Sequence, residues 1–258
     1  MKILAITASD RKKGNSELAV KYIAKKLNAN LEILRLTKMK IEPCKACYAC
    51  LYGKKCEIDD DVYEILTKIE ESDAVIISSP VYFLDATSKL KALLDRAFLA
   101  IPYVDSFSRK KCVVLTHHGF AEGRGWASAT HLMLARAFCL NVLANVEIHA
   151  TLPAEVVAKK ENVEKLDLAA KILLSGEKYV ADGQCPVCLN TVFRHADDKL
   201  ICPLCLSELD KELKVLKEGK WWLSREWFKK HFFKELLELK EEFKKRREEL
   251  ERAAERLL

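Results

Sequence analysis

The chain has 258 residues; 50% of them are hydrophobic and 32% are charged, and only 8 are Gly and 6 are Pro. This composition excludes a disordered, collagen-like or low-complexity chain, and the length allows one large domain or one domain with a smaller module. The net charge of +6 arises from 44 basic and 38 acidic residues that are interspersed, so it does not by itself require nucleic acid as a partner. We expect a cytoplasmic protein without membrane association, because the sequence shows no signal peptide and no run of about 18 apolar residues.

Five apolar, β-rich runs alternate with segments of helical period. They comprise residues 2–9, 31–37, 74–81, 111–116 and 143–151. Runs such as Val75-Ile76-Ile77 are continuously apolar, as strands are when helices cover both faces of their sheet. The alternation predicts an α/β fold with a flavodoxin-like, doubly wound, five-stranded parallel sheet of order 2-1-3-4-5. Ligands of such sheets bind beyond the carboxyl ends of the strands, so we expect a site in the loops after the first, third and fourth strands.

The pattern divides the chain into three parts. The last helix of the repeat is expected at residues 163–181 with Asp182-Gly183 as its stop, so residues 1–183 form the first domain. Residues 184–223 contain a small cysteine module, and residues 224–258, without Gly or Pro, predict a long amphipathic C-terminal helix. Its apolar seam comprises Phe232, Leu236, Leu239, Phe243, Leu250, Ala253 and Leu257. We expect this seam to bury against another subunit in a homo-oligomer, a dimer or a tetramer.

The loop after the first strand, residues 8–16 (ASDRKKGNS), is suited to a phosphate. A helix N-terminus offers unpaired N–H groups and a dipole that favours an anion, Ser9 and Ser16 supply hydroxyls, and Arg11 supplies charge. Asn15 or Ser16 is expected to cap the helix. Taken alone, the loop fits a capped turn with solvated lysines equally well.

The loop after the third strand, Ser78-Ser79-Pro80-Val81-Tyr82-Phe83, could hold a flat ring. Its backbone groups can hydrogen-bond the edge of a ring while Tyr82 and Phe83 cover apolar ring surface. Taken alone, an aromatic pair at a strand end more often serves packing.

The first cysteine group has gaps of two, two and five residues. It comprises Cys44, Cys47, Cys50 and Cys56. Such a compact run can wrap one iron-sulfur cube, so it predicts a [4Fe-4S] cluster; zinc or unoccupied thiols are the alternatives. The following Asp59-Asp60-Asp61 is expected to cap the next helix.

The second cysteine group consists of two C-x-x-C knuckles separated by thirteen residues. It comprises Cys185, Cys188, Cys202 and Cys205. This spacing predicts a closed tetrathiolate site in a zinc-ribbon or rubredoxin-like module, with zinc preferred and rubredoxin-type iron as the rival. Leu189 and Leu206 stand where Gly is usual after the second cysteine of a knuckle, and His195 is expected to be a surface residue rather than a ligand.

Several of these motifs together resemble the iron-sulfur flavoproteins, within the flavodoxin-fold NAD(P)H-dependent FMN reductases. The resemblance rests on residues 9–16, on residues 79–83 with residues 89–96 behind them, and on the first cysteine group, and it covers about residues 1–183. Ala8 and Asp10 depart from it, since the family often has Gly and Pro there. The resemblance implies FMN, with contacts from Ser9, Arg11, Gly14, Asn15, Ser16, Pro80, Val81, Tyr82, Phe83, Thr116, His117 and Gly119.

The function that this resemblance implies is that of a flavin-dependent oxidoreductase. Electrons would pass from NAD(P)H or reduced ferredoxin through FMN and the [4Fe-4S] cluster to a small-molecule or protein acceptor, with no catalytic side chain required. The first alternative is an NAD(P)H-dependent FMN, quinone or oxygen/peroxide reductase with a peripheral cluster. The second is a redox-sensing nucleic-acid-binding protein that uses the zinc ribbon and the basic tail. Nucleic acid is not our expectation, because Trp221, Trp222, Trp227 and Phe228 are more simply read as the apolar start of the C-terminal helix.

Overall fold

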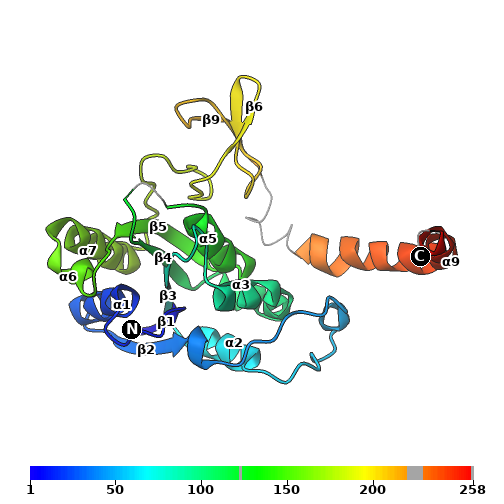
Figure 1. The fold of residues 1–258 in the computed structure, drawn as a ribbon, viewed down its shortest axis with the longest axis horizontal. Helices are drawn as coiled ribbons and strands as arrows, with labels where there is room; N and C mark the ends of the chain where they lie inside the picture. The colour runs from blue at the N-terminus through cyan, green and yellow to red at the C-terminus, as the bar shows by residue number, and fades with distance from the viewer. Residues whose placement is uncertain (122–123, 220–228, 257–258) are drawn as a thin grey trace.

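The computed structural model describes residues 1–121, 124–219 and 229–256. Its main sheet is parallel, with the order β2-β1-β3-β4-β5 that the sequence predicts (Figure 1). The strands are β1 (Lys2–Thr7), β2 (Asn30–Arg35), β3 (Ala74–Pro80), β4 (Lys111–His118) and β5 (Asn141–His149). The flavodoxin-like fold is therefore confirmed.

Helices cover both faces of the sheet. One face packs against α1 (Asn15–Lys26), α6 (Glu155–Ala158) and α7 (Lys160–Ser175). The other packs against α2 (Val62–Glu70), α3 (Ser88–Asp95) and α5 (Ala127–Ala137). Successive strand residues alternate between the two cores, as Ile76 and Ile77 do, because side chains along a strand point to opposite faces. This explains the continuously apolar strands.

The end of α7 differs from the sequence prediction. The helix stops at Ser175 rather than at residue 181, because Gly176 adopts a left-handed conformation with φ 78° and donates its N–H to the carbonyl of Ile172. Residues 177–184 are therefore an extended link that runs past β5 to the second cysteine group. Asp182-Gly183 lies in this link and ends no helix.

The long connection between β2 and α2 carries the first cysteine group. After η1 (Leu36–Lys38) it extends beyond the end of the sheet and contains η2 (Ala49–Tyr52) (Figure 1). Across from it lie η3 (Ala97–Tyr103) and α4 (Val104–Phe107), which follow α3. The first cysteine group therefore lies on one irregular segment, the β2–α2 connection, and this segment packs against a second one, η3, at one side of the domain.

The second cysteine group belongs to a small antiparallel sheet of order β6-β7-β8-β9, which stands above β5 and α5 in Figure 1. Its strands are β6 (Arg194–Ala196), β7 (Lys199–Ile201), β8 (Glu208–Leu209) and β9 (Val215–Lys217). Its buried residues, among them Cys188 and Leu204, belong to the same hydrophobic cluster as the α2, α3 and α5 face of the main sheet. The module thus packs directly on the first domain.

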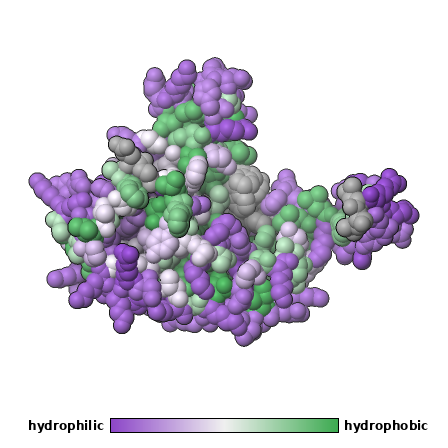
Figure 2. Space-filling view, viewed as in Figure 1, coloured by the Kyte–Doolittle hydropathy of each residue, from purple (hydrophilic) through white to green (hydrophobic). Residues whose placement is uncertain are grey.

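The described part of the C-terminal helix comprises Lys229 and Lys230, η4 (His231–Glu235) and α9 (Leu236–Glu255), and it projects from the body (Figure 1). Leu236 and Leu237 pack against a small cluster around Leu51 and Ile101 of the same chain. Leu236 of the predicted seam therefore contacts its own subunit, while the side chain of Phe232, the first residue of the seam, lies outside what the structure describes. Farther out, Leu239, Phe243 and Leu250 are exposed, and Figure 2 shows mainly hydrophilic side chains at the outer end of the helix.

Four aromatic residues considered above, Trp221, Trp222, Trp227 and Phe228, lie outside the described residues, as does Leu257. Among the helices that the structure describes, none is both long enough and apolar enough to cross a membrane.

Candidate functional site

A cavity of about 310 Å³ opens where the carboxyl ends of β1, β3 and β4 meet. Ten of the twelve residues proposed to contact FMN line it: Ser9, Arg11, Gly14, Asn15, Ser16, Pro80, Val81, Tyr82, His117 and Gly119. Lys13, Ala150, Thr151 and Pro153 complete the lining. Loops that are far apart in the sequence thus form one site, as the strand order predicts.

The two remaining candidates, Phe83 and Thr116, lie outside this cavity. The Oγ1 atom of Thr116 is buried and lies 2.8 Å from Nδ1 of His131, behind the strand. Phe83 is fully exposed at the tip of a two-residue turn, because Phe83 and Leu84 have φ angles of 48° and 66°. It lines an adjoining apolar hollow of about 610 Å³ together with Leu84 and Phe120.

The N-terminus of α1 forms one end of the cavity. Gly14 is the N-cap, and its N–H donates to the carbonyl of Arg11 at 2.9 Å, which closes a tight turn. A Cβ atom at Gly14 would lie only 3.1 Å from that carbonyl oxygen, so the turn favours glycine. The first amides of α1, those of Asn15 and Ser16, have no acceptor inside the helix and can bind an anion.

The expected cap by Asn15 or Ser16 is wrong, because Asn15 serves a different purpose. Its Nδ2 donates to the carbonyls of Ala150 and Leu152 at 3.1 and 3.0 Å, and its Oδ1 accepts from the N–H of Val156. The side chain ties α1 to the loop after β5. For an anion in the cavity, Asn15 therefore offers its backbone amide rather than its side chain.

A chain of hydrogen bonds fixes the tautomer of His117. The Ser78 hydroxyl donates its single proton to the carbonyl of Ser16 at 2.9 Å, so it accepts from the Nε2–H of His117, also at 2.9 Å. The Nδ1 atom of His117 is buried and has no partner among the described residues. Burial lowers the pKa of His117 to about 3, so the ring is neutral near pH 7. His117 thus lines the cavity as a neutral ring and not as a cationic proton donor.

The first cysteine group lines a separate, small cavity together with Arg96, Phe98 and Leu99. Positive φ angles at Ala46 and Tyr48 reverse the chain between the cysteines, and the N–H of Ala46 donates to Sγ of Cys44 at 3.4 Å. Thiolates around one tetrahedral zinc ion lie about 3.7 Å apart, given a Zn–S bond of about 2.3 Å. In the described parts of the chain, only the second group brings its Sγ atoms within 4.8 Å of one another. No three sulfur atoms of the first group therefore lie within that distance of one another.

Arg96 is the residue of this site that the sequence analysis missed. Its side chain is only 1% exposed, and it donates to Sγ of Cys56 at 3.5 Å and to the carbonyl of Glu42 at 3.0 Å. It also forms an ion pair with the fully buried carboxylate of Asp60. Arg96 therefore supplies positive charge and an N–H···S hydrogen bond to the cysteine group. The sequence shows that Arg96 follows a helix, but this position alone does not show whether its side chain is buried or exposed to solvent.

The expectation that Asp59-Asp60-Asp61 caps α2 is only partly right. Asp61 occupies the N-cap position, but its carboxylate accepts from the N–H of Lys40 at 2.7 Å instead of from the helix. Asp60 accepts from the N–H of Val62 at 3.3 Å and from that of Glu42 at 3.0 Å, besides its pair with Arg96. The acidic run thus anchors the cysteine loop as well as starting a helix.

The second cysteine group forms a closed site. Cys185, Cys188, Cys202 and Cys205 are all fully buried. The Sγ atoms of Cys188 and Cys202 lie 3.4 Å apart and those of Cys185 and Cys205 3.7 Å apart, close to the spacing that one tetrahedral ion requires.

Two leucines complete the knuckles of this site. Leu189 and Leu206 take left-handed conformations, with φ 70° and 58°, so both knuckles form without the usual glycine. His195 is exposed on β6 and is not part of the group.

The sheet order defines a protein of flavodoxin-like fold, with a cavity at the strand ends. Residues 1–152 match the family described as NADPH-dependent FMN reductase. The chain belongs to this family, whose members are flavin-dependent oxidoreductases.

Curated relatives are iron-sulfur flavoproteins. The chain is 42% identical to one from Archaeoglobus fulgidus over 103 residues, which are 39% of this chain and 50% of the relative. It is 38% identical to one from Methanosarcina thermophila over 102 residues, which are 38% of this chain and 53% of the relative. The chain thus spans about half the length of these relatives, and over that part the resemblance found in the sequence is confirmed.

Solved structures share the fold at low sequence identity. A flavone reductase superposes with a TM-score of 0.65 at 19% identity, covering 100% of this chain and 98% of the other. An NAD(P)H:quinone oxidoreductase from Methanothermobacter marburgensis superposes with a TM-score of 0.50 at 19% identity, covering 67% and 98%. These likenesses extend the evidence for the fold.

Proposed function

We propose that this chain binds FMN in the cavity at the strand ends and transfers electrons from NAD(P)H or reduced ferredoxin, by way of a [4Fe-4S] cluster at the first cysteine group, to an acceptor. The observation that carries the proposal is the convergence of the α1 N-terminus and the β3 and β4 loops on one cavity. When bound, FMN exchanges electron pairs with a donor and the cluster carries single electrons. The side chains of the protein bind and position these two groups.

The phosphate end of the ligand is assigned to the start of α1. One side of the cavity supplies hydrogen-bond donors and positive charge. These come from the backbone amides of Asn15 and Ser16, the hydroxyls of Ser9 and Ser16, and the guanidinium of Arg11. Pro80, Val81 and Tyr82 line the same cavity and supply backbone groups and apolar surface for the ring. His117 lines the same cavity with a neutral ring.

The cysteine groups are assigned different metals. Cys44, Cys47, Cys50 and Cys56 would hold the [4Fe-4S] cluster, and the hydrogen bond from Arg96 to Cys56 would stabilise the thiolate charge. Cys185, Cys188, Cys202 and Cys205 would hold one zinc ion, or rubredoxin-type iron, because their sulfur atoms already approach tetrahedral spacing. The homo-oligomer and the cytoplasmic location stay predictions.

One observation favours a second candidate function. The apolar hollow lined by Phe83, Leu84 and Phe120 adjoins the cavity, with Val81, Tyr82 and Gly119 lining both. A planar apolar acceptor such as a quinone would fit beside the flavin there. In that case the chain would act as an NAD(P)H-dependent quinone reductase with a peripheral cluster.

The test is FMN binding by the full chain after removal of bound flavin. Arg11→Ala with Ser16→Ala removes a charged donor and a hydroxyl donor, which are worth about 1.5–3 and 0.5–1.5 kcal/mol. Lys12→Ala is the matched control, because Lys12 lies in the same loop and carries the same charge but does not line the cavity. Weaker FMN binding in the double variant alone supports the proposal; undiminished FMN binding in it contradicts the assigned phosphate position.

A further inference from the structure

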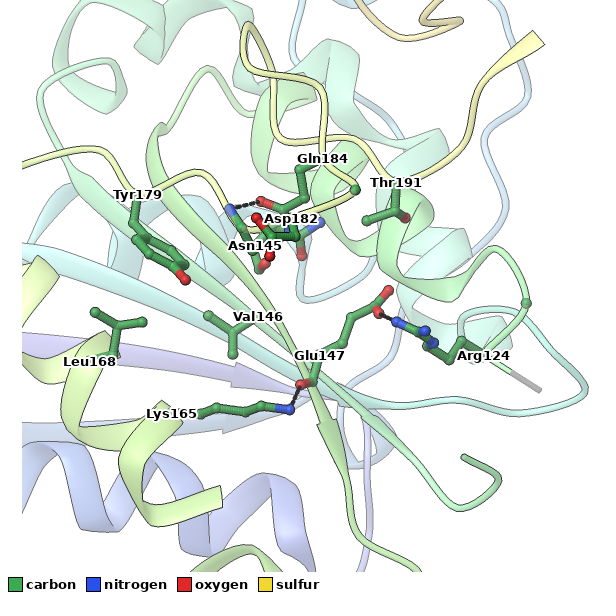
Figure 3. Close-up of a pocket in the computed structure, with 13 residues that line it drawn as sticks. Arg124, Asn145, Val146, Glu147, Lys165, Leu168, Tyr179, Asp182, Gln184 and Thr191 are labelled. Atoms are coloured by element: carbon green, nitrogen blue, oxygen red, sulfur yellow. Dashed lines mark hydrogen bonds and ion pairs between the residues drawn. The ribbon is translucent and has the colours of Figure 1, made fainter. Parts of the chain in front are cut away.

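The outer edge of β5 is covered by three hydrogen bonds from outside the sheet. β5 is an edge strand, and the carbonyls of Leu143, Asn145 and Glu147 point away from β4. They accept, in order, from the N–H of Tyr179 at 2.8 Å, from Nε2 of Gln184 at 2.6 Å and from Nζ of Lys165 at 2.9 Å, the last two drawn in Figure 3. Two of these donors lie in the link that runs to the second cysteine group. An uncovered edge would expose these groups to water or to another chain.

The first knuckle of the second cysteine group is tied to the first domain through its carbonyls. Nζ of Lys178 donates to the carbonyls of Pro186 and Val187 at 2.7 and 2.8 Å. Arg136 of α5 donates to that of Cys188 at 3.4 Å, and Nδ2 of Asn145 donates to that of Leu189 at 3.1 Å. Four consecutive carbonyls thus accept from side chains of the domain or of the link.

The direction of these carbonyls depends on the shape of the knuckle. Cys185 and Cys188 must turn their sulfur atoms toward Cys202 and Cys205, and this places Leu189 in its left-handed conformation. A bound ion would stabilise that turn, because metal binding to such a site is coupled to its folding. Four thiolates around a divalent ion also carry a net negative charge, and the cations of Arg136 and Lys178 lie against the knuckle on the side of the domain.

We propose that the metal ion of the second cysteine group locks residues 177–190 onto the outer edge of β5, so that this module is a metal-dependent cover of the flavin domain. The ligand is one thiophilic divalent ion, zinc first and ferrous iron second. Because all four sulfur ligands are buried and no fifth protein ligand is needed, the site is structural rather than catalytic. The inference rests on the proposed metal at this group, and it does not depend on FMN or on the iron-sulfur cluster.

The experiment is hydrogen–deuterium exchange of the full chain, metal-loaded and after treatment with a zinc chelator, with bound metal measured in parallel. Metal removal is expected to raise exchange in residues 141–149 and 177–184 about tenfold while residues 2–7 of the central strand β1 stay protected. Lys178→Met removes the hydrogen bonds to the carbonyls of Pro186 and Val187 and leaves all four cysteines in place. It is expected to raise exchange in the same segments with metal still bound. Lys160→Met is the matched control, because the Lys160 side chain is 92% exposed on α7.

These outcomes distinguish the lock, which is the metal-dependent attachment of residues 177–190 to the edge of β5, from the metal site itself. A metal-loaded protein whose β5 exchange is unaffected both by the chelator and by Lys178→Met would overturn the lock and leave the metal assignment intact. A chain that binds neither zinc nor iron at this group would overturn the metal assignment and, with it, the lock. Increased exchange confined to residues 141–149 and 177–184 supports the proposal, whichever of the two metals is found.

Discussion

The buried ion pair between Arg96 and Asp60 can be tested by a single substitution. The two side chains are 1% and 0% exposed. Arg96→Met removes the cation and keeps much of the volume. Among the described residues, the Asp60 carboxylate then keeps the backbone N–H groups of Glu42 and Val62 as hydrogen-bond donors. Removing one partner of a buried pair costs about 3–5 kcal/mol, a large part of the roughly 5–15 kcal/mol by which proteins of this kind are stable.

Urea unfolding of the iron-free chain measures this loss. Lys91→Met is the matched control, because Lys91 pairs with Asp95 at the surface, where such pairs contribute about 0–1 kcal/mol. Combining Arg96→Met with Asp60→Leu should recover much of the stability, since apolar side chains can replace a buried pair at little cost. A free energy of unfolding that falls no further in Arg96→Met than in Lys91→Met would refute the anchoring role of the pair.

Three further predictions concern other parts of the chain. Cys47→Ser should lose iron, measured by metal analysis, while FMN absorbance persists; full iron retention would show that Cys47 is not a ligand. Because burial lowers the pKa of His117 from 6.5 to about 3, the unfolded chain binds more protons between these pH values, so stability falls as the pH falls through this window. His117→Asn should weaken that dependence in urea unfolding at a series of pH values, and an unchanged slope would contradict it. Deleting residues 224–258 should lower the oligomeric state measured by sedimentation. An unchanged oligomeric state would show that the helix packs on its own subunit and not on another.

The strand order and the closed second cysteine group were predictable from sequence because each depends on a local pattern. Apolar runs of β-rich residues indicate the strands, and the two C-x-x-C pairs indicate which four sulfur atoms can meet. The convergence of the loops at residues 9–16 and 80–82 also followed from the sheet order. These features need no knowledge of which distant side chains meet.

Features that depend on long-range contacts were not predictable in the same way. Asn15 looked like a helix cap, but its partners, Ala150 and Leu152, are about half the chain away in sequence. Arg96 gains its role only when the fold brings it to Cys56 and Asp60. The stop of α7 at Gly176 carried a local signal, an isolated glycine after an apolar helix face, and could have been found.

The most direct test of the central claim is the absorption spectrum of the anaerobically purified full chain, with flavin and metal analysis of the same sample. FMN bound in the strand-end cavity and a cluster at the first cysteine group predict flavin bands over a broad iron-sulfur absorbance, with iron and acid-labile sulfide in equal amounts. The second cysteine group predicts zinc, or additional iron without sulfide. A folded chain that carries no flavin and does not take up added FMN would contradict the proposed function.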